Sequence, residues 1–132
     1  MGGGTEGLLL DGEALRLRDP EALVGRRVLC RREVTSTSAV AAALAASGEL
    51  EGTVVLAERQ TAGRGRLGRT WASPPGLGLW FSVILRPPIP ASRAPVLTQV
   101  AAVAVAEGVE EVAGRLPGGI KWPNDLILTG WK

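Results

Sequence analysis

The sequence contains no histidine and a single cysteine, and both shortages limit its chemistry. Without histidine there is no Ser-His-Asp or Cys-His catalysis and no histidine-based zinc motif. One cysteine forms neither an internal disulfide nor a cysteine-ligated metal site. Cys30 lies in the stretch "RRVLCRREV" and is expected to be a buried structural thiol. A reactive thiol stays open as the alternative, because Arg31 and Arg32 follow it directly.

Aromatic residues and net charge are also scarce. The chain has no tyrosine, one phenylalanine and a formal net charge of only +2. Nucleic-acid-binding modules usually carry stacking aromatics and a broad basic face, so a basic nucleic-acid-binding module is kept only as the non-enzyme alternative. No apolar run is long enough to cross a bilayer, and the N-terminus does not follow the pattern of a secretory signal. We therefore expect a cytoplasmic protein with no membrane partner.

The 132 residues are enough for one domain and too few for two ordinary ones. Residues 1–25 are expected to form an N-terminal lead-in and residues 26–132 the domain. Alternating or β-branched apolar residues predict strands, and alanine-rich or helically spaced apolar residues predict helices. We expect strands over 26–34, 53–58 and 79–86 and on both sides of a turn at 123–124, and helices over 35–48 and 92–114. The predicted fold class is α/β (α+β).

The stretch "TAGRGRLGRTWASPPG" (residues 61–76) matches two phosphate-binding patterns by spacing alone. Both the dinucleotide fingerprint and the Walker A loop need a helix after the last glycine. The prolines and glycines that follow Gly68 exclude that helix. What remains is a glycine-rich loop with three arginines, which is suited to bind phosphate or carboxylate, with Trp71 beside it to stack on a ring. A solvated basic hairpin is the alternative.

A second polar group occurs in "IKWPNDLIL" near the C-terminal end. Lys121 ends a short predicted strand, and Asn124 and Asp125 follow the Trp122–Pro123 step. A lysine with a nearby carboxylate can neutralise phosphate charge and help to hold magnesium. An ordinary β-turn with an exposed lysine is the alternative for this segment alone. Trp80 and Trp122 are expected in the core.

Together the two motifs resemble the biotin protein ligases (biotin–[acetyl-CoA-carboxylase] ligases). "ERQTAGRGRLGRTWASPPGLGLWFSVILRP" is similar to the glycine-arginine signature of that family, "KWPNDL" to its second signature, and "TSTS" to its Ser-Thr-Asn segment. The resemblance implies a class II aminoacyl-tRNA-synthetase/biotin ligase-like fold, with a mixed, mainly antiparallel sheet and flanking helices. Residues 26–132 would be the N-terminal part of the catalytic domain, which in the family continues beyond Lys132, so we expect an incomplete domain.

The activity implied by this resemblance is the ATP-dependent ligation of biotin to a lysine of a biotin carboxyl carrier protein through biotinyl-5′-AMP. ATP and biotin would be substrates, and Mg²⁺ would lie near Asp125. No DNA-binding domain is expected in this chain, and a homodimer is left open. A lipoate or octanoate ligase or transferase of the same fold is the enzymatic alternative, although those relatives lack the arginine-loop signature.

The resemblance also assigns roles to individual residues of this sequence. The catalytic residues would be Lys121, Arg64 and Arg66. The biotin site would consist of Ser36, Thr37, Gln60, Gly63, Arg64 and Lys121, and the nucleotide site of Arg66, Arg69, Trp71, Asn124 and Asp125. Ser36 and Thr37 are equally well explained as helix caps, and both roles are compatible. A plain surface position is the minor alternative for Gln60.

Overall fold

A computed structural model describes residue 15 and residues 20–114 and 118–128 of the chain. The chain divides into two compact units, residues 1–86 and 87–132. The predicted lead-in over residues 1–25 lies mostly outside the described residues, and the predicted domain boundary at residue 26 stays a prediction. Within the described part of the chain, no helix combines the length and the apolar character needed to cross a bilayer.

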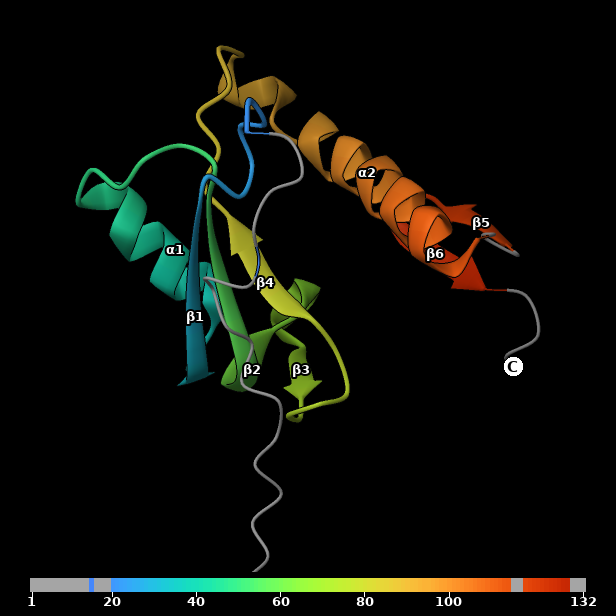
Figure 1. The fold of residues 1–132 in the computed structure, drawn as a ribbon, viewed down its shortest axis with the longest axis horizontal. Helices are drawn as coiled ribbons and strands as arrows, with labels where there is room; N and C mark the ends of the chain where they lie inside the picture. Colours follow the sequence, from blue (N-terminus) through green and yellow to red (C-terminus); the bar gives the residue numbers. More distant parts are fainter. Residues whose placement is uncertain (1–14, 16–19, 115–117, 129–132) are drawn as a thin grey trace, which may run out of the picture. The chain divides into compact units, whose positions relative to one another are not determined.

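The first unit is organised around one long central strand. Strand β2 (Thr53–Arg64) pairs in parallel with β1 (Arg27–Val34) along one edge. Along its other edge it pairs antiparallel with β4 (Trp80–Val83) in its first half and with β3 (Thr70–Ser73) in its second half (Figure 1). The sheet is therefore mixed, with more antiparallel than parallel pairs, as predicted. Strand β4 is shorter than the predicted strand over 79–86.

Helix α1 (Thr37–Ala46) connects β1 to β2 and packs against β2 and β4. A parallel pair needs a crossover of this kind, because its strands run in the same direction. The helix buries Ala41 against Val55 of β2 and Ile84, and Val55 is fully buried. The helix ends before Gly48, whose φ of +92° is the left-handed conformation that favours glycine. The predicted helix and its glycine stop are confirmed.

A β-bulge shapes the second half of β2. Gln60 lies opposite Ser73, and Gly63 lies opposite Trp71, so two residues of β2 face one residue of β3 between these pairs. The backbone N–H of Ala62, inside the bulge, donates to the carbonyl oxygen of Thr35 at 2.8 Å. The bulge therefore ties the second half of β2 to the segment that enters α1.

The arginine segment is more ordered than the sequence predicts. Gly63 and Arg64 were expected in a loop, but both belong to β2. No α-helix begins directly after Gly68, as predicted. The connection to β3 is only a tight turn, which contains the short 3₁₀ helix η1 (Arg66–Gly68) and closes with a 2.7 Å hydrogen bond from Gly65 N to Arg69 O. Strand pairing explains the difference, because β3 extends the ladder to the opposite Arg64–Thr70 pair.

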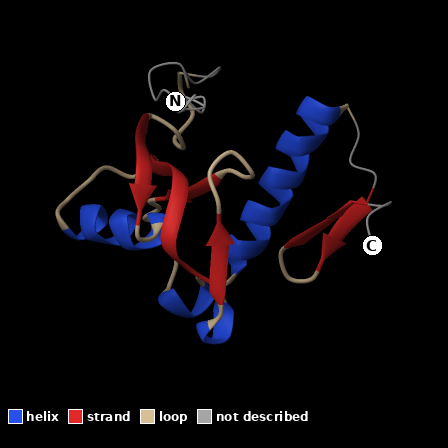
Figure 2. Ribbon diagram, turned by 90° about the horizontal axis from the view of Figure 1, so that it is seen from below, coloured by secondary structure: helices blue, strands red, loops and turns tan. Residues whose placement is uncertain are grey.

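The second unit contains a helix and a hairpin. After the 3₁₀ helix η2 (Ala91–Arg93), helix α2 (Val96–Ala113) ends at Gly114, and strands β5 (Gly118–Lys121) and β6 (Asp125–Leu128) form an antiparallel hairpin. Figure 2 shows the two strands of this hairpin side by side. The predicted strands on both sides of the 123–124 turn are confirmed.

The expectation of a buried Trp122 is wrong, because this residue lies in the tight turn and is 74% exposed. Trp80, at the start of β4 in the first unit, is half-buried.

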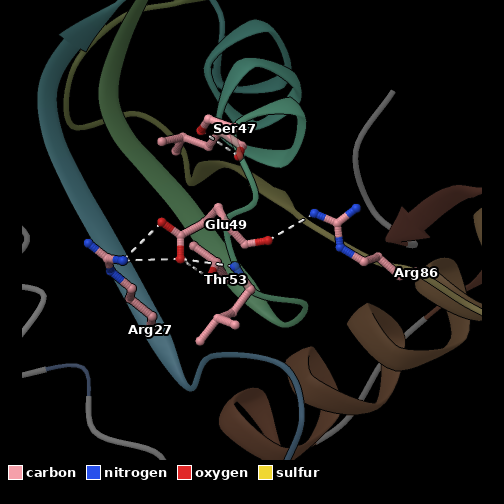
Figure 3. A network of polar contacts seen from close by, with 7 residues as sticks. Arg27, Ser47, Glu49, Thr53 and Arg86 are labelled. Atoms are coloured by element: carbon pink, nitrogen blue, oxygen red, sulfur yellow. Dashed lines mark hydrogen bonds and ion pairs between the residues drawn. The ribbon is translucent and has the colours of Figure 1, made fainter.

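A polar network anchors the C-terminal end of α1 in the first unit (Figure 3). The carboxylate of Glu49 accepts hydrogen bonds from Arg27 at 2.9 and 3.1 Å and from the hydroxyl of Thr53 at 3.2 Å. The Arg86 guanidinium donates to the carbonyl oxygens of Ala45 and Glu49 at 3.0 and 2.9 Å. The Ala45 carbonyl oxygen also accepts the backbone N–H of Gly48 at 3.3 Å, so Arg86 adds a second donor there, and its charge complements the helix dipole.

Candidate functional site

A network of buried and half-buried polar side chains lies where α1 begins. The backbone N–H and the hydroxyl of Thr37 both donate to Oε1 of Gln60, at 2.8 and 3.1 Å. Gln60 lies on β2, 23 residues further along the chain. Thr37 is only 3% exposed, and no fully buried side-chain polar atom among the described residues lacks a partner. Every buried side-chain polar atom of this network therefore has at least one hydrogen-bond partner.

The N-terminus of α1 is capped by Gln60 and not by its own serine. Ser36 takes the N-cap position with extended backbone angles, but its side chain makes no capping hydrogen bond. Oε1 of Gln60 accepts the N–H of Thr37 instead, one of the first four helical donors that need an outside partner. The alternative in which the Ser36 and Thr37 side chains cap the helix is wrong, although Ser36 takes the N-cap position. The minor alternative of a surface Gln60 is also wrong, because this residue is half-buried. The bulge explains this, because it places β2 beside the start of the helix.

Strand β4 contributes a serine to the same network. Oγ of Ser82 lies 2.9 Å from Oγ1 of Thr37 and 3.2 Å from Oγ of Ser38. Thr37 already uses its hydroxyl hydrogen on Gln60, so Ser82 must donate to Thr37, and Ser38 must donate to Ser82. Donor counting thus gives a directed chain of hydrogen bonds that ends on Oε1 of Gln60.

Strand β3 contributes the other end of the network. Nε2 of Gln60 donates to Oγ of Ser73 at 3.0 Å, and Oγ of Ser73 donates to the carbonyl oxygen of Trp71 at 3.3 Å. Gly63 packs directly over these three residues. A Cβ atom at Gly63 would lie 2.5 Å from the Trp71 carbonyl oxygen and 3.0 Å from Oγ of Ser73. Glycine is required here for close packing.

The predicted anion-binding residues adjoin this network along the chain. Arg64 ends β2, Arg66 and Arg69 flank the turn, and all three are exposed. Trp71 is 57% exposed on β3, directly after the turn and opposite Gly63. Three positive charges and an accessible indole ring therefore lie within eight residues of one β-hairpin. This hairpin can bind an anion that carries a flat ring.

The remaining predicted residues lie in the second unit. Lys121 and Asp125 are opposite each other in the β5–β6 register and close the turn that contains Asn124, and all three residues are exposed. A cation and a carboxylate thus occupy opposite register positions at the end of one hairpin. Whether this hairpin joins the Gln60 network in one active site stays a prediction.

The structure brings Thr37, Gln60 and Gly63 together, as the sequence predicts for one binding site, and adds Ser73 and Ser82. Sequence reasoning missed these two serines. One signal for Ser82 was present, because it alternates with Trp80 and Ile84 on the inner face of a predicted strand. A serine on an otherwise apolar strand face needs a hydrogen-bond partner. Ser73, between Ala72 and Pro74, carried no such signal.

The fold resembles solved structures of biotin protein ligases. The enzyme from Leishmania major, solved in complex with biotin, aligns with a TM-score of 0.63 and 30% sequence identity over 77% of this chain and 46% of that one. The enzyme from Aquifex aeolicus, in complex with biotin and ATP, aligns with a TM-score of 0.58 and 36% identity over 76% of this chain and 40% of that one. The chain thus has the mixed α/β, class II synthetase-like fold of these ligases.

The chain is a member of the biotin/lipoate A/B protein ligase family, whose model matches residues 28–132. Among curated relatives, the bifunctional ligase/repressor BirA of Bacillus subtilis is 47% identical over 110 residues, which cover 83% of this chain and 34% of the relative. The biotin–[acetyl-CoA-carboxylase] ligase of Mycobacterium tuberculosis is 41% identical over 101 residues, 74% of this chain and 38% of the relative. The chain therefore spans little more than a third of the length of these relatives.

Proposed function

We propose that this chain contributes the biotin-binding and adenylate-forming part of a biotin protein ligase. The reaction is the ATP-dependent attachment of biotin to a lysine of a biotin carboxyl carrier protein through biotinyl-5′-AMP. Residues 26–132 are the N-terminal part of the catalytic domain, and the protein acts in the cytoplasm. The observation that carries the proposal is the Thr37–Gln60–Gly63 site directly beside the arginine hairpin.

The polar site suits the uncharged head of biotin. Ser36 and Thr37 lie at the start of α1 with their side chains buried, and Gln60 presents an amide beside them. Such groups fix the orientation of a polar, neutral ring system through directed hydrogen bonds. Gly63 is assigned, with Gln60, to the carboxylate arm of biotin.

The arginine hairpin suits the charged end of the reaction. Biotin's carboxylate attacks the α-phosphate of ATP, an acyl-phosphate bond forms, and pyrophosphate leaves. Both reactants are anions, so cations must offset their repulsion and the charge that accumulates on phosphorus. Arg64 at the end of β2 is assigned to the carboxylate, and Arg66 to the carboxylate and the phosphate. Arg69 and Trp71 are assigned to the nucleotide, with the exposed indole against adenine.

The β5–β6 hairpin is assigned to the phosphate side of the same reaction. Lys121 would bridge the oxygens of biotin's carboxylate and of the α-phosphate, and Asn124 and Asp125 would position the nucleotide. Among the described residues, no group of three potential metal-ligating side chains is present. Mg²⁺ is usually held by one or two carboxylates together with substrate phosphates, so Asp125 fits as its single protein ligand. Bound there, the ion would neutralise phosphate charge.

The second step transfers the acyl group to the carrier. The lysine amine of the carrier protein attacks the activated carbonyl, the amide bond forms and AMP leaves. The mixed anhydride is sensitive to water, so the hairpin of Arg64–Trp71 is proposed to cover it until the carrier arrives. The name of the Mycobacterium tuberculosis relative refers to acetyl-CoA carboxylase, which supports a carrier protein of that enzyme as the acceptor.

Adenylate formation tests the proposal directly. The purified chain is incubated with Mg²⁺, ATP labelled in its α-phosphate, and either biotin or lipoate, and the products are separated by thin-layer chromatography. We expect labelled biotinyl-AMP with biotin only. After addition of an apo-carrier domain, the label should be released as AMP while the carrier becomes biotinylated. Arg93→Ala, an exposed arginine outside the assigned residues, is the matched control and should leave the yield unchanged.

Two outcomes would reverse the assignment. Lipoyl-AMP without biotinyl-AMP would place the chain with the lipoate ligases of the same family. Absence of any adenylate, together with salt-sensitive binding to random oligonucleotides that biotin does not change, would support the basic nucleic-acid-binding module.

A further inference from the structure

The orientation of the Gln60 amide follows from chemistry alone. A backbone N–H can only donate, so the Gln60 atom that lies 2.8 Å from Thr37 N must be the oxygen. The amide nitrogen then faces Ser73 on β3, and Nε2 donates to Oγ of Ser73 at 3.0 Å. Both lone pairs of Oε1 are used by Thr37, through its N–H and its hydroxyl.

Ser73 has one orientation that satisfies its surroundings. Its oxygen accepts from Gln60, and its single hydrogen is donated to the Trp71 carbonyl oxygen at 3.3 Å. Ser73 is only 5% exposed, and the bulge in β2 places it directly opposite Gln60 in the strand register. Gly63 closes the space above, since a Cβ there would lie 3.0 Å from Oγ of Ser73 and 3.2 Å from Nε2 of Gln60.

We propose that Ser73 is the positioning residue of the polar site. It holds the Gln60 amide so that Oε1 is fully occupied by Thr37 and only the second hydrogen of Nε2 remains to bind a ligand. Gln60 therefore acts on the ligand as a hydrogen-bond donor, and the matching ligand atom is an acceptor oxygen, such as that of a carboxylate. This role in ligand binding rests on the proposed function, whereas the fixed amide does not.

Side-chain amide NMR of the whole chain tests the fixed amide without any ligand. The sequence has only two glutamines, Gln60 and Gln99, and one asparagine, Asn124, so the spectrum contains three side-chain amide groups. We expect the Gln60 protons to exchange with solvent at least tenfold more slowly than the Asn124 protons, because Nε2 of Gln60 is hydrogen-bonded to a buried serine. The Gln60→Glu variant identifies the resonance by removing it.

Ser73→Ala removes the partner of the amide. We expect the Gln60 resonances to shift and their exchange to approach that of Asn124, and Ser73→Thr, which keeps the hydroxyl, to restore slow exchange. Ser47→Ala is the matched control, because the Ser47 hydroxyl also donates to a backbone carbonyl, that of Leu44 at 2.9 Å, but far from Gln60. The backbone amide spectrum reports whether each variant folds. Unchanged Gln60 resonances in Ser73→Ala would overturn the proposal.

Biotin titration by calorimetry adds the ligand readout. We expect Ser73→Ala to weaken biotin binding about tenfold, which corresponds to about 1.4 kcal/mol, and Ser47→Ala to leave it unchanged. A wild-type chain with a protected Gln60 amide but no biotin binding would contradict the proposed function and leave the positioning role intact. Fast Gln60 exchange in the wild-type chain would overturn the positioning role by itself, also where Ser73→Ala does not fold.

Discussion

Oε1 of Gln60 accepts a 2.8 Å hydrogen bond from the backbone nitrogen of Thr37 and so caps helix α1 from a neighbouring strand. Most helices are capped by a residue of their own first turn, whose side chain folds back onto the free N–H groups. Here the cap comes from the strand that follows the helix. The start of α1 is thereby fixed relative to the sheet, and the same amide is available to a ligand.

The Gln60 cap predicts a stability cost that an ordinary surface residue would not show. Gln60→Ala leaves the N–H of Thr37 without an acceptor and Oγ of Ser73 without its donor, so we expect a loss of about 1–2 kcal/mol in the free energy of unfolding. Urea unfolding followed by tryptophan fluorescence measures it. Gln99→Ala on α2 is the matched control and should change the free energy by less than about 0.5 kcal/mol. Equal effects of the two variants would contradict the cap.

Substitution of Gly63 is expected to destabilise the fold because of close packing and not because of backbone conformation. Gly63→Ala would push a methyl group to 2.5 Å from the Trp71 carbonyl oxygen, so the β2–β3 pair must separate. We expect a loss of about 1–3 kcal/mol in the free energy of unfolding. Gly108→Ala is the control, since a Cβ at that position in α2 meets nothing within 4 Å, and it should stabilise by about 0.5–1 kcal/mol. A neutral Gly63→Ala variant would show that β3 is loosely held.

The Glu49 carboxyl group is expected to make the stability of the fold depend on pH. The backbone N–H of Leu50 lowers the pKa of the Glu49 carboxyl group most, the Arg27 guanidinium and the Thr53 hydroxyl act in the same direction, and partial burial opposes them. A carboxyl group whose pKa is lower in the folded state stabilises the fold above the ordinary glutamate pKa of about 4.3. This stabilisation is lost as the pH falls through the lower folded-state value.

The measurement is the thermal midpoint between about pH 7 and pH 3, the interval around the ordinary glutamate value. Glu49→Gln should lower the midpoint at neutral pH and reduce its fall in acid, because the carboxylate that Arg27 binds is no longer present. Glu33→Gln is the control, since the ion pair of Glu33 with Arg59 is exposed and contributes little. Identical acid profiles for wild type and Glu49→Gln would remove Glu49 from this role.

Substitution of Lys121 is expected to slow adenylation, the first chemical step of the proposed reaction. In the full-length ligase, Lys121→Ala removes the cation assigned to the acyl-phosphate oxygens, and we expect biotin-dependent pyrophosphate exchange to fall by roughly 10²–10³-fold. Arg93→Ala should leave that exchange unchanged. A wild-type exchange rate in Lys121→Ala would exclude Lys121 from adenylation.

Substitution of Arg66 is expected to affect the retention of biotinyl-AMP and not its formation. It begins the turn between β2 and β3 and is exposed, so its proposed task is to keep that hairpin over the intermediate. Arg66→Ala in the full-length ligase should still form biotinyl-AMP but release it about tenfold faster. This corresponds to a lowering of the free-energy barrier to release by about 1.4 kcal/mol. Rapid filtration of labelled intermediate measures this release, with Arg32→Ala as the control. Unchanged release would contradict the covering role.

The sequence predicted most elements of the fold because they depend on local pattern. The β-branched residues at 53–55, the alanines of α1 and the glycine at 48 each indicate one local conformation. The extent of β2 was not predictable in the same way. Gly63 and Arg64 resemble loop residues, and only pairing with β3 makes them part of a strand. Trp122 was misjudged for a similar reason, since hydrophobicity predicts burial only where another element covers the side chain.

The sequence by itself determined the family and the chemistry that is excluded, because motif spacing and the absence of histidine are properties of the chain alone. The tertiary structure decided which polar side chains share hydrogen bonds. Gln60, Ser73 and Thr37 are distant in sequence, and the β-bulge that brings them together arises only when β2 pairs with β3 and contacts the segment before α1. Hydrogen bonds require distances near 3 Å, and folding sets those distances.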